Sequence, residues 1–219
     1  MDESGSPDHL SSSLTDLMTS LMVIFVLLLL VFLDRKAGAD PAVADTLLKK
    51  LRQDLVPQGF NDNTIRPDPR ERNAILVIVP DRLMNFETGK SALQRDGERF
   101  LKTSIPKFAD VLCSDQFRSS VESIIVEGHT DTHPYIGHTP EESQNLNLKL
   151  SQDRSMEVVK NALADLSGAE AERACFLEKL SATGRGEQEQ EATPEESRRV
   201  IFRIRVKARE VETVKVEVQ

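Results

Sequence analysis

The sequence predicts a membrane-anchored α/β protein: a single transmembrane α-helix, a linker helix, and then an α/β domain with a mixed sheet and helices packed on one side. Three observations predict this fold class. An uncharged apolar run occupies residues 17–33. A short seam of apolar residues with helical spacing follows it. Over the rest of the chain, short β-branched apolar runs alternate with amphipathic stretches, as in domains that pack helices against a sheet.

Residues 14–33 have the length of a transmembrane helix, because about twenty residues at 1.5 Å each cross the hydrocarbon layer of a bilayer. The preceding tail, residues 1–13, contains no Lys or Arg, whereas a signal peptide begins with cationic residues and has a shorter apolar core. We therefore favour an uncleaved single span over a signal peptide or a buried helix, although Ala37-Gly38-Ala39 is a weak cleavage site.

Asp16 is a carboxylate at the mouth of this apolar run. An acid there costs roughly 2.5–3.5 kcal/mol on insertion scales, so it indicates a functional site. The alternative is that Asp16 only caps the helix, since Asp is a favoured N-cap residue. Arg35 and Lys36 follow the span, and by the positive-inside rule they would place the C-terminal side in the cytoplasm.

A linker over residues 34–72 is expected to contain an amphipathic helix at 41–56. Asp40-Pro41 is typical of a helix start, and Pro57 with Gly59 of its end. The apolar residues of this helix form a seam able to pair beside a dimerised span. They are Ala44, Leu48, Leu51 and Leu55.

The remaining residues, 73–219, are long enough for one globular domain with its own core. The expected strands are 74–80, 121–127, 176–183 and 200–206, and the expected helices are 91–112, with a break or kink at Pro106, and 150–166. Strand 200–206 alternates in polarity, which predicts one buried and one largely wet face. The valines at 214, 216 and 218 are candidates for an extra strand.

Two cysteines, Cys113 and Cys175, lie in this domain. They are able to form a disulfide in an oxidising compartment, which would add about 4 kcal/mol in the chain-entropy model. Buried cysteines also serve as small apolar residues, so the pattern leaves both readings open.

Composition excludes several functions. The net charge is −8, and the chain has no basic stripe interleaved with aromatic residues, which argues against a nucleic-acid partner. The sequence contains no recognisable nucleophile–base set and no Gly-rich phosphate loop, so we do not expect an enzyme. The histidines at 129, 133 and 138 are irregularly spaced and lack cysteine partners, so ordinary polar surface is favoured over a metal site, and we expect no cofactor.

Four short motifs occur in order within the domain. They are Gly128-His129-Thr130-Asp131, Asn147-x-x-Leu150-Ser151-x-x-Arg154, Gly184-Arg185-Gly186-Glu187 and Arg198-Arg199-Val200. This set resembles the OmpA-like peptidoglycan-binding domain over residues 73–207, and the segment 86–89 resembles the family's entry loop. The segment 132–146 is an insertion, about twice the usual length at this place in the family, and we expect it to remodel the rim of the wall-binding site.

The resemblance implies a site for diaminopimelate, the residue of the peptidoglycan stem that carries a carboxylate and an ammonium on one carbon. Asp131 would take the ammonium. Arg154, expected in the first turn of its helix, would take the carboxylate through charge-assisted hydrogen bonds. Thr130, Asn147 and Leu150 would shape the loop and the helix entry. Without the surrounding motifs, a plain salt bridge or two solvated charges would be the preferred interpretation.

The N-terminal segment 16–25 resembles the membrane helix of MotB-type stator subunits. The resemblance implies that Asp16 binds and releases the driving ion, with Thr19 assisting, and that the span dimerises inside a pentameric MotA-like (ZorA-like) ring. It also implies a single pass through the bacterial inner membrane, with a cytoplasmic N-terminus and a periplasmic domain bound to peptidoglycan. This orientation opposes the Lys/Arg tally, and we prefer it because the peptidoglycan signature has several parts.

The short acidic tail and compact linker are more like the B subunit (ZorB) of Zorya anti-phage defence systems, which itself resembles MotB, than like a flagellar stator. A flagellar stator subunit and a passive anchor between membrane and wall are the alternatives. The transported ion is expected to be H⁺ rather than Na⁺.

Overall fold

The structure is a computed structural model that describes residues 8–35, 41–84 and 86–207. It divides into two compact units, Met1–Gly38 and Ala39–Gln219. The valines at 214–218, expected as an extra strand, lie outside the described residues, as do the tail residues 1–7.

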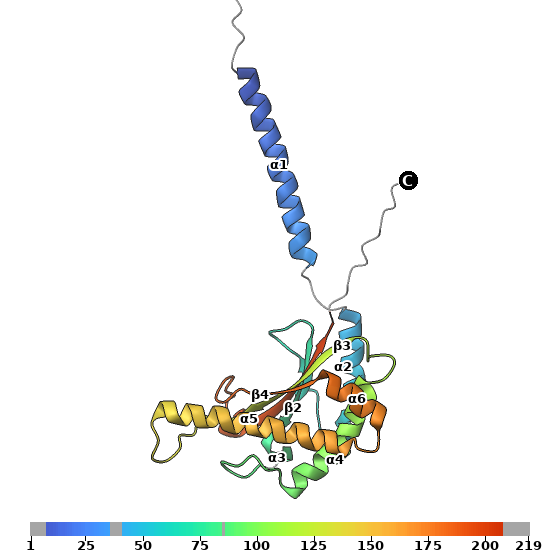
Figure 1. Ribbon diagram of the computed structural model, residues 1–219, viewed down its shortest axis with the longest axis vertical. Helices are drawn as coiled ribbons and strands as arrows, with labels where there is room; N and C mark the ends of the chain where they lie inside the picture. Colours follow the sequence, from blue (N-terminus) through green and yellow to red (C-terminus); the bar gives the residue numbers. More distant parts are fainter. Residues whose placement is uncertain (1–7, 36–40, 85, 208–219) are drawn as a thin grey trace, which may run out of the picture. The chain divides into compact units, whose positions relative to one another are not determined.

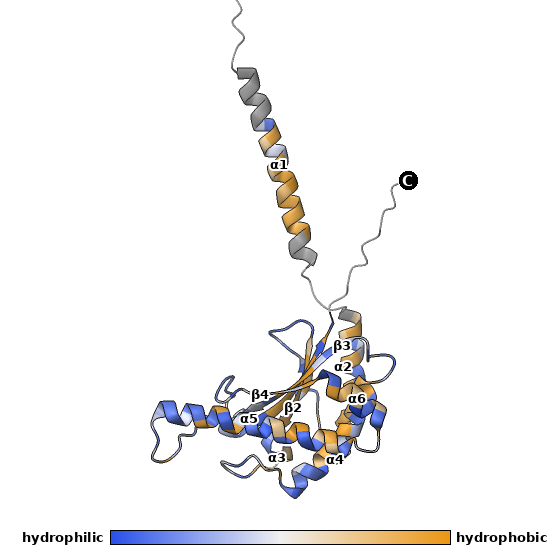
Figure 2. Ribbon diagram, viewed as in Figure 1, coloured by the Kyte–Doolittle hydropathy of each residue, from blue (hydrophilic) through white to orange (hydrophobic). Residues whose placement is uncertain are grey.

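The described residues of the first unit form the helix α1, from Asp8 to Arg35. Its side chains are described from Thr15 to Val31, all are exposed, and those from Leu21 onward are all apolar (Figure 2). Over the part of the chain that the structure describes, no helix is both long enough and apolar enough to cross a membrane. Because α1 begins at Asp8, Asp16 lies about two turns inside the helix, so the N-cap alternative is wrong.

The second unit is built on a five-stranded sheet with the order β1-β2-β5-β3-β4. The strands are β1 (Ile65–Pro67), β2 (Ala74–Pro80), β3 (Val121–His129), β4 (Leu180–Gly184) and β5 (Arg199–Val206). β5 runs antiparallel to β2 and β3, whereas β3 and β4 are parallel. The mixed sheet confirms the predicted α/β class.

This topology gathers three chain segments at one end of the sheet. Arg199, the first residue of β5, pairs with Pro80, the last of β2, and with His129, the last of β3. The segments that follow β2 and β3 therefore meet the segment that precedes β5. Side chains that are distant in the sequence become neighbours at this place.

The helices cover one face of the sheet (Figure 1). They are α2 (Pro41–Leu55), the 3₁₀ turn Val56–Gln58, α3 (Asp81–Met84), α4 (Arg95–Leu112), α5 (Pro140–Asp165) and α6 (Glu170–Lys179). A further short helix, α7 (Pro194–Ser197), precedes β5. One apolar core lies between this face and α2, α4, α5 and α6, and alternate residues of β5, from Val200 to Val206, contribute to it. Helices on one side of the sheet were expected from the sequence.

Helix α2 belongs to the folded unit rather than to a linker. Leu47, Leu51 and Leu55 are fully buried in the common core, and Leu48 is nearly so. Most of the apolar seam expected to pair beside a dimerised span is thus used within the chain. The folded unit starts before α2, and the boundary that the sequence analysis set at residue 73 falls inside it.

Several predicted element boundaries are wrong. Helix α5 begins at Pro140, ten residues before the predicted start at 150, because Thr139 and Glu142 form a capping box. Arg154 therefore lies well inside α5 and not in its first turn. Residues 176–179, expected as strand, end α6. Helix α4 continues through Pro106.

The second face of β5 is buried, in contrast to the wet face expected. Arg203 binds Glu127 in a two-pronged ion pair (Nε–Oε1 2.8 Å, Nη2–Oε2 3.1 Å) and also contacts Asp68. Segment 185–191 lies over this face, where the carbonyl of Glu189 accepts a hydrogen bond from Arg199 at 2.7 Å. The charged residues that alternate along β5 therefore belong to buried ion pairs rather than to a wet face. Buried charges are tolerated only when each has a partner.

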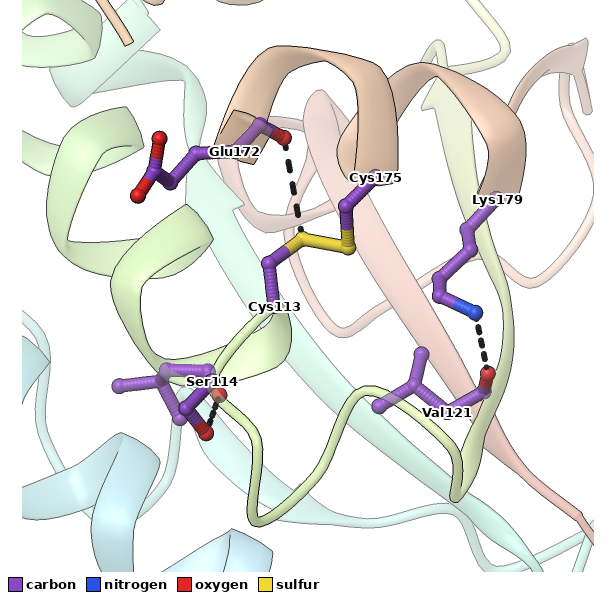
Figure 3. The surroundings of a disulfide bond; sticks show 7 residues. Cys113, Ser114, Val121, Glu172, Cys175 and Lys179 are labelled. Atoms are coloured by element: carbon purple, nitrogen blue, oxygen red, sulfur yellow. Dashed lines mark hydrogen bonds between the residues drawn. A yellow bond between two sulfur atoms is a disulfide. The ribbon is translucent and has the colours of Figure 1, made fainter. Parts of the chain in front are cut away.

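Cys113, which follows α4, and Cys175 of α6 form a disulfide with Cα atoms 6.0 Å apart (Figure 3). Near it, Lys179 at the end of α6 donates a hydrogen bond to the carbonyl of Val121 at 2.9 Å. Of the two readings that the sequence left open, the structure contains the bond.

Candidate functional site

A cleft of about 620 Å³ opens at the end of the sheet where β2 and β3 stop and β5 starts. The structure brings together in this cleft all the residues that the motifs assign to the wall-binding site. They are Thr130, Asp131, Asn147, Leu150 and Arg154. They come from the segment after β3 and from α5.

The glycine and serine positions of the motifs pack α5 onto the sheet. A Cβ at Gly128 of β3 would come within 2.1 Å of the Ser151 carbonyl, so only glycine allows this approach. The hydroxyl of Ser151 accepts a hydrogen bond from the Gly186 amide at 2.8 Å. This packing fixes the distance between Asp131, just beyond β3, and Arg154, on the next turn of α5.

Arg154 is buried and held by backbone oxygens. Its Nε donates to the carbonyl of Lys90 (3.0 Å) and its Nη2 to that of Glu87 (3.2 Å), and its guanidinium carbon lies 4.8 Å from the centre of the Phe86 ring. Burial is the main cause that lowers the pKa of Arg154, partly offset by the negative charge of Asp81. The group stays cationic, and no carboxylate of the described residues forms an ion pair with it.

Asp131 is paired with Arg198 and not with Arg154. Nη1 of Arg198 lies 2.6 Å from Oδ2 of Asp131, and its Nε lies 3.2 Å from Oδ2 of Asp81. Burial opposes the charge of Arg198, but the hydrogen bonds with these two carboxylates raise its pKa above the usual value. The sequence predicted that Asp131 and Arg154 lie at one rim of the sheet, and both line the same cleft. It did not predict an ion pair between them.

Asn147 connects α5 to the two loops around the cleft. Its side-chain nitrogen donates to Oε1 of Glu187 at 2.8 Å and to the carbonyl of His133 at 3.3 Å. Thr130 is buried, and its amide donates to the carbonyl of Gly186 at 2.9 Å. Both residues hold loops in place around the charged groups.

The insertion 132–146 supplies one wall of the cleft. His133, Pro134, Tyr135 and Ile136 line it, and Ile136 is fully exposed. The amide of Tyr135 donates to the hydroxyl of Ser143 at 3.1 Å, which ties this loop to the first turns of α5. In the described parts of the chain, no group of three or more His, Cys, Asp or Glu side chains is placed to hold a metal ion.

In the first unit, Asp16 and Thr19 lie one turn apart on α1, and both are exposed. The hydroxyl of Thr19 donates to the carbonyls of Thr15 and Asp16, each at 2.9 Å. It therefore bonds its own helix backbone, and its oxygen lone pairs remain the groups that could face an ion.

Sequence reasoning missed two charged residues of the cleft. Arg198 was part of a motif but had no assigned role, and Asp81 was not singled out. The available signal was topological: Asp81 follows a strand as Asp131 does, and Arg198 precedes one. Only the order of strands in the sheet shows that Asp81, Asp131 and Arg198 lie at the same end of it.

The mixed sheet and the helical layer of the second unit form a fold that is also found in solved structures. No family model matches the chain, and no curated protein does. Among solved structures, the chain is similar to a MotB-like protein from Desulfovibrio vulgaris, with a TM-score of 0.53 and 18% identity, covering 76% of this chain and 96% of that one. This likeness shows the fold of the second unit.

Two further solved structures match with lower scores. One is the cell wall anchor of the T6SS from Pseudomonas aeruginosa, with a TM-score of 0.46 and 20% identity over 73% of this chain and 97% of that one. The other is the periplasmic domain of Helicobacter pylori MotB, with a TM-score of 0.46 and 16% identity over 62% and 85%.

Proposed function

We propose that this chain is the wall-anchored subunit of an ion-driven membrane motor, and that its second unit binds peptidoglycan through the cleft. The observation that carries the proposal is the cleft itself, in which the five motif-assigned residues lie together, with opposite charges at Asp131 and Arg154. The role is binding and anchoring rather than catalysis.

The chemistry of the cleft suits diaminopimelate. Arg154 is a buried cation that forms no ion pair with a carboxylate of the described residues, so the ligand carboxylate would complete it through strong charge-assisted hydrogen bonds. Asp131 lines the same cleft and would receive the ammonium. Leu150 and the loop 133–136 would contact the aliphatic part of the stem.

Co-sedimentation of the detergent-solubilised full chain with purified peptidoglycan sacculi tests this proposal. We expect the wild type to pellet with sacculi and Arg154→Gln to stay in the supernatant. Arg99→Gln is the matched control, because Arg99 is exposed on α4 and its ion pair is with Asp96 of the same helix, away from the cleft residues. Equal pelleting of wild type and Arg154→Gln would refute the cleft as the wall-binding site.

The membrane half of the proposal rests on α1. We propose that residues 14–33 cross the bacterial inner membrane once, with the N-terminus in the cytoplasm and the domain in the periplasm; residues 14, 32 and 33 lie outside the described side chains. Exposed apolar side chains along α1 support insertion. The Cys113–Cys175 disulfide supports the periplasm against the Lys/Arg tally, because disulfides persist in oxidising compartments.

Within that span, Asp16 would bind and release the transported ion, H⁺ in preference to Na⁺, with Thr19 offering a hydroxyl oxygen. Its interior position in α1 supports this role, because it does not cap the helix. The span would act as a homodimer inside a pentameric MotA-like ring. Each charge that crosses is worth roughly 2.3 kcal/mol per 100 mV, which can bias a rotation.

We place this motor in anti-phage defence of the Zorya type, with a flagellar stator as the alternative. Phage plating on cells that carry the native locus tests the assignment, with wild type compared with Asp16→Asn at equal protein level. Loss of protection in Asp16→Asn supports an ion-driven defence motor, whereas retained protection indicates a passive anchor. A wild type that protects against no phage favours the flagellar role.

A further inference from the structure

We infer that Asp81 is a second carboxylate for the ligand ammonium, and that Arg198 is the positioning residue that holds Asp81 beside Asp131. The inference rests on the proposed function and specifies which chemical group the cleft selects. It assigns the ammonium to a pair of carboxylates rather than to Asp131 alone.

The geometry of Arg198 carries the first step. Its guanidinium reaches Asp81 through Nε at 3.2 Å and Asp131 through Nη1 at 2.6 Å, so one rigid planar group spaces both carboxylates. The backbone adds a second constraint, because the amide of Asp81 donates to the carbonyl of Arg198 at 3.2 Å. Asp81 is thereby fixed to the start of β5 through its main chain and its side chain.

The charge count carries the second step. Two carboxylates share one guanidinium within the cleft, which leaves a negative charge at this pole. Glu195 also forms an ion pair with Arg198, at 3.4 Å, so a third carboxylate shares this guanidinium. Among the residues that the structure describes, Arg154 at the other pole donates to backbone carbonyls, those of Lys90 and Glu87. The charges of Asp81 and Asp131 also act on Arg154, so these groups face one shared cleft, which offers a negative and a positive pole to a zwitterionic centre.

The free oxygen atoms carry the third step. Arg198 binds Oδ2 of each carboxylate, and Oδ1 of Asp131 accepts a hydrogen bond from the His133 amide at 3.1 Å. Oδ1 of Asp81 has no partner among the residues that the structure describes. Asp81 is about one-quarter exposed and lines the cleft, so this oxygen is available to an ammonium.

The consequence is selectivity for the amine of the ligand's zwitterionic centre. A stem with meso-diaminopimelate would satisfy both poles. A stem in which 2-aminopimelate replaces it keeps the carboxylate for Arg154 but lacks the ammonium. The ratio of the two affinities therefore reports on the carboxylate pair and not on the stability of the domain.

Isothermal titration of the full chain in detergent micelles with these two soluble muropeptides tests the inference. We expect the wild type to prefer the diaminopimelate stem by about tenfold, the size of a charge-assisted contact near the surface. Asp81→Asn should remove most of this preference while its affinity for the 2-aminopimelate stem stays unchanged. Asp96→Asn, on the exposed start of α4, is the control and should keep the wild-type ratio.

Arg198→Lys provides a second variant in case Asp81→Asn does not fold. Lys keeps the charge but cannot bridge two carboxylates with a planar fork, so the preference should fall. If Asp81→Asn and Arg198→Lys keep the wild-type ratio, or if each weakens both ligands equally, the inference is overturned and the wall-binding proposal stands. If the wild type binds neither muropeptide, both fail.

Discussion

Gly128 shows at the scale of a single residue how the sequence sets the cleft. It sits in β3 against the backbone of Ser151, at a place where any side chain would collide with a carbonyl. The collision involves main-chain atoms, which cannot rotate away as a flexible side chain can. The motif glycine is therefore a packing requirement and not a ligand contact.

We predict that Gly128→Ala lowers the free energy of unfolding by roughly 2–4 kcal/mol, because α5 must move away from β3. Gly168→Ala is the matched control, since no atom lies within 4 Å of the Cβ it would add. Urea unfolding followed by circular dichroism measures both. A Gly128→Ala variant as stable as Gly168→Ala would show that the close approach of β3 and α5 is not present.

At the scale of elements, α2 is the helix for which the prediction and the structure differ most. The sequence predicted a linker helix, whereas the structure packs α2 into the core of the second unit. Three of its leucines, Leu47, Leu51 and Leu55, are fully buried, and the helix packs on β1 and α4, so it is an integral layer of the second unit. A helix that served only as a linker would unfold or move without affecting the domain. Truncation of one buried leucine distinguishes the two roles.

We expect Leu51→Ala to destabilise the second unit by about 2–5 kcal/mol, as a buried leucine truncation does when its cavity cannot collapse. Leu177→Ala on α6, where the side chain is half exposed, should cost less than about 0.5–1 kcal/mol. Thermal denaturation of both variants is the measurement. Equal melting temperatures for the two variants would show that α2 is a linker and not part of the folded unit.

The end of α5 predicts a pH effect. Burial raises the pKa of Asp165, the last residue of the helix; the charge of Lys102 lowers this pKa in part, and that of Glu98 raises it further. A raised folded-state pKa means that its contribution to stability is complete below the unfolded pKa near 3.8 and is lost as the pH rises through the folded value. A negative charge at a helix C-terminus is also unfavourable.

Asp165→Asn should therefore melt at a higher temperature than wild type at neutral pH, and the difference should close as the pH is lowered toward 4, about the ordinary pKa of Asp. Melting temperatures at a series of pH values test this. Asp110→Asn on α4, where Asp110 is exposed, is the control. A gain that grows toward acid pH would contradict the assigned direction of the shift.

At the scale of the whole molecule, the disulfide secures the second unit by linking α4 to α6 across a separation of 62 residues. In the chain-entropy model such a loop contributes about 4 kcal/mol. The double variant Cys113→Ser, Cys175→Ser should lose roughly that amount in unfolding free energy, and added reductant should affect only the wild type. Wild type that responds to reductant no more than the double variant would contradict the bond.

The sequence predicted the α/β class, four of the strands in outline and the residues that line the cleft. Strands 74–80 and 200–206 were visible because their β-branched runs end at proline or alternate strictly. It did not predict the burial of α2, because a local apolar seam does not identify its partner. It missed Asp81 and the pairing of Arg198, because these contacts depend on the antiparallel placement of β5 between β2 and β3.

The most direct test of the central claim is a structure of the full chain bound to a muropeptide that ends in meso-diaminopimelate. The account predicts the ligand in the cleft between α5 and the loop 132–139. Its carboxylate would lie about 2.7–2.9 Å from the guanidinium of Arg154, with its ammonium on the side of Asp131. A muropeptide bound elsewhere on the domain, with Arg154 still held only by the carbonyls of Glu87 and Lys90, would contradict it.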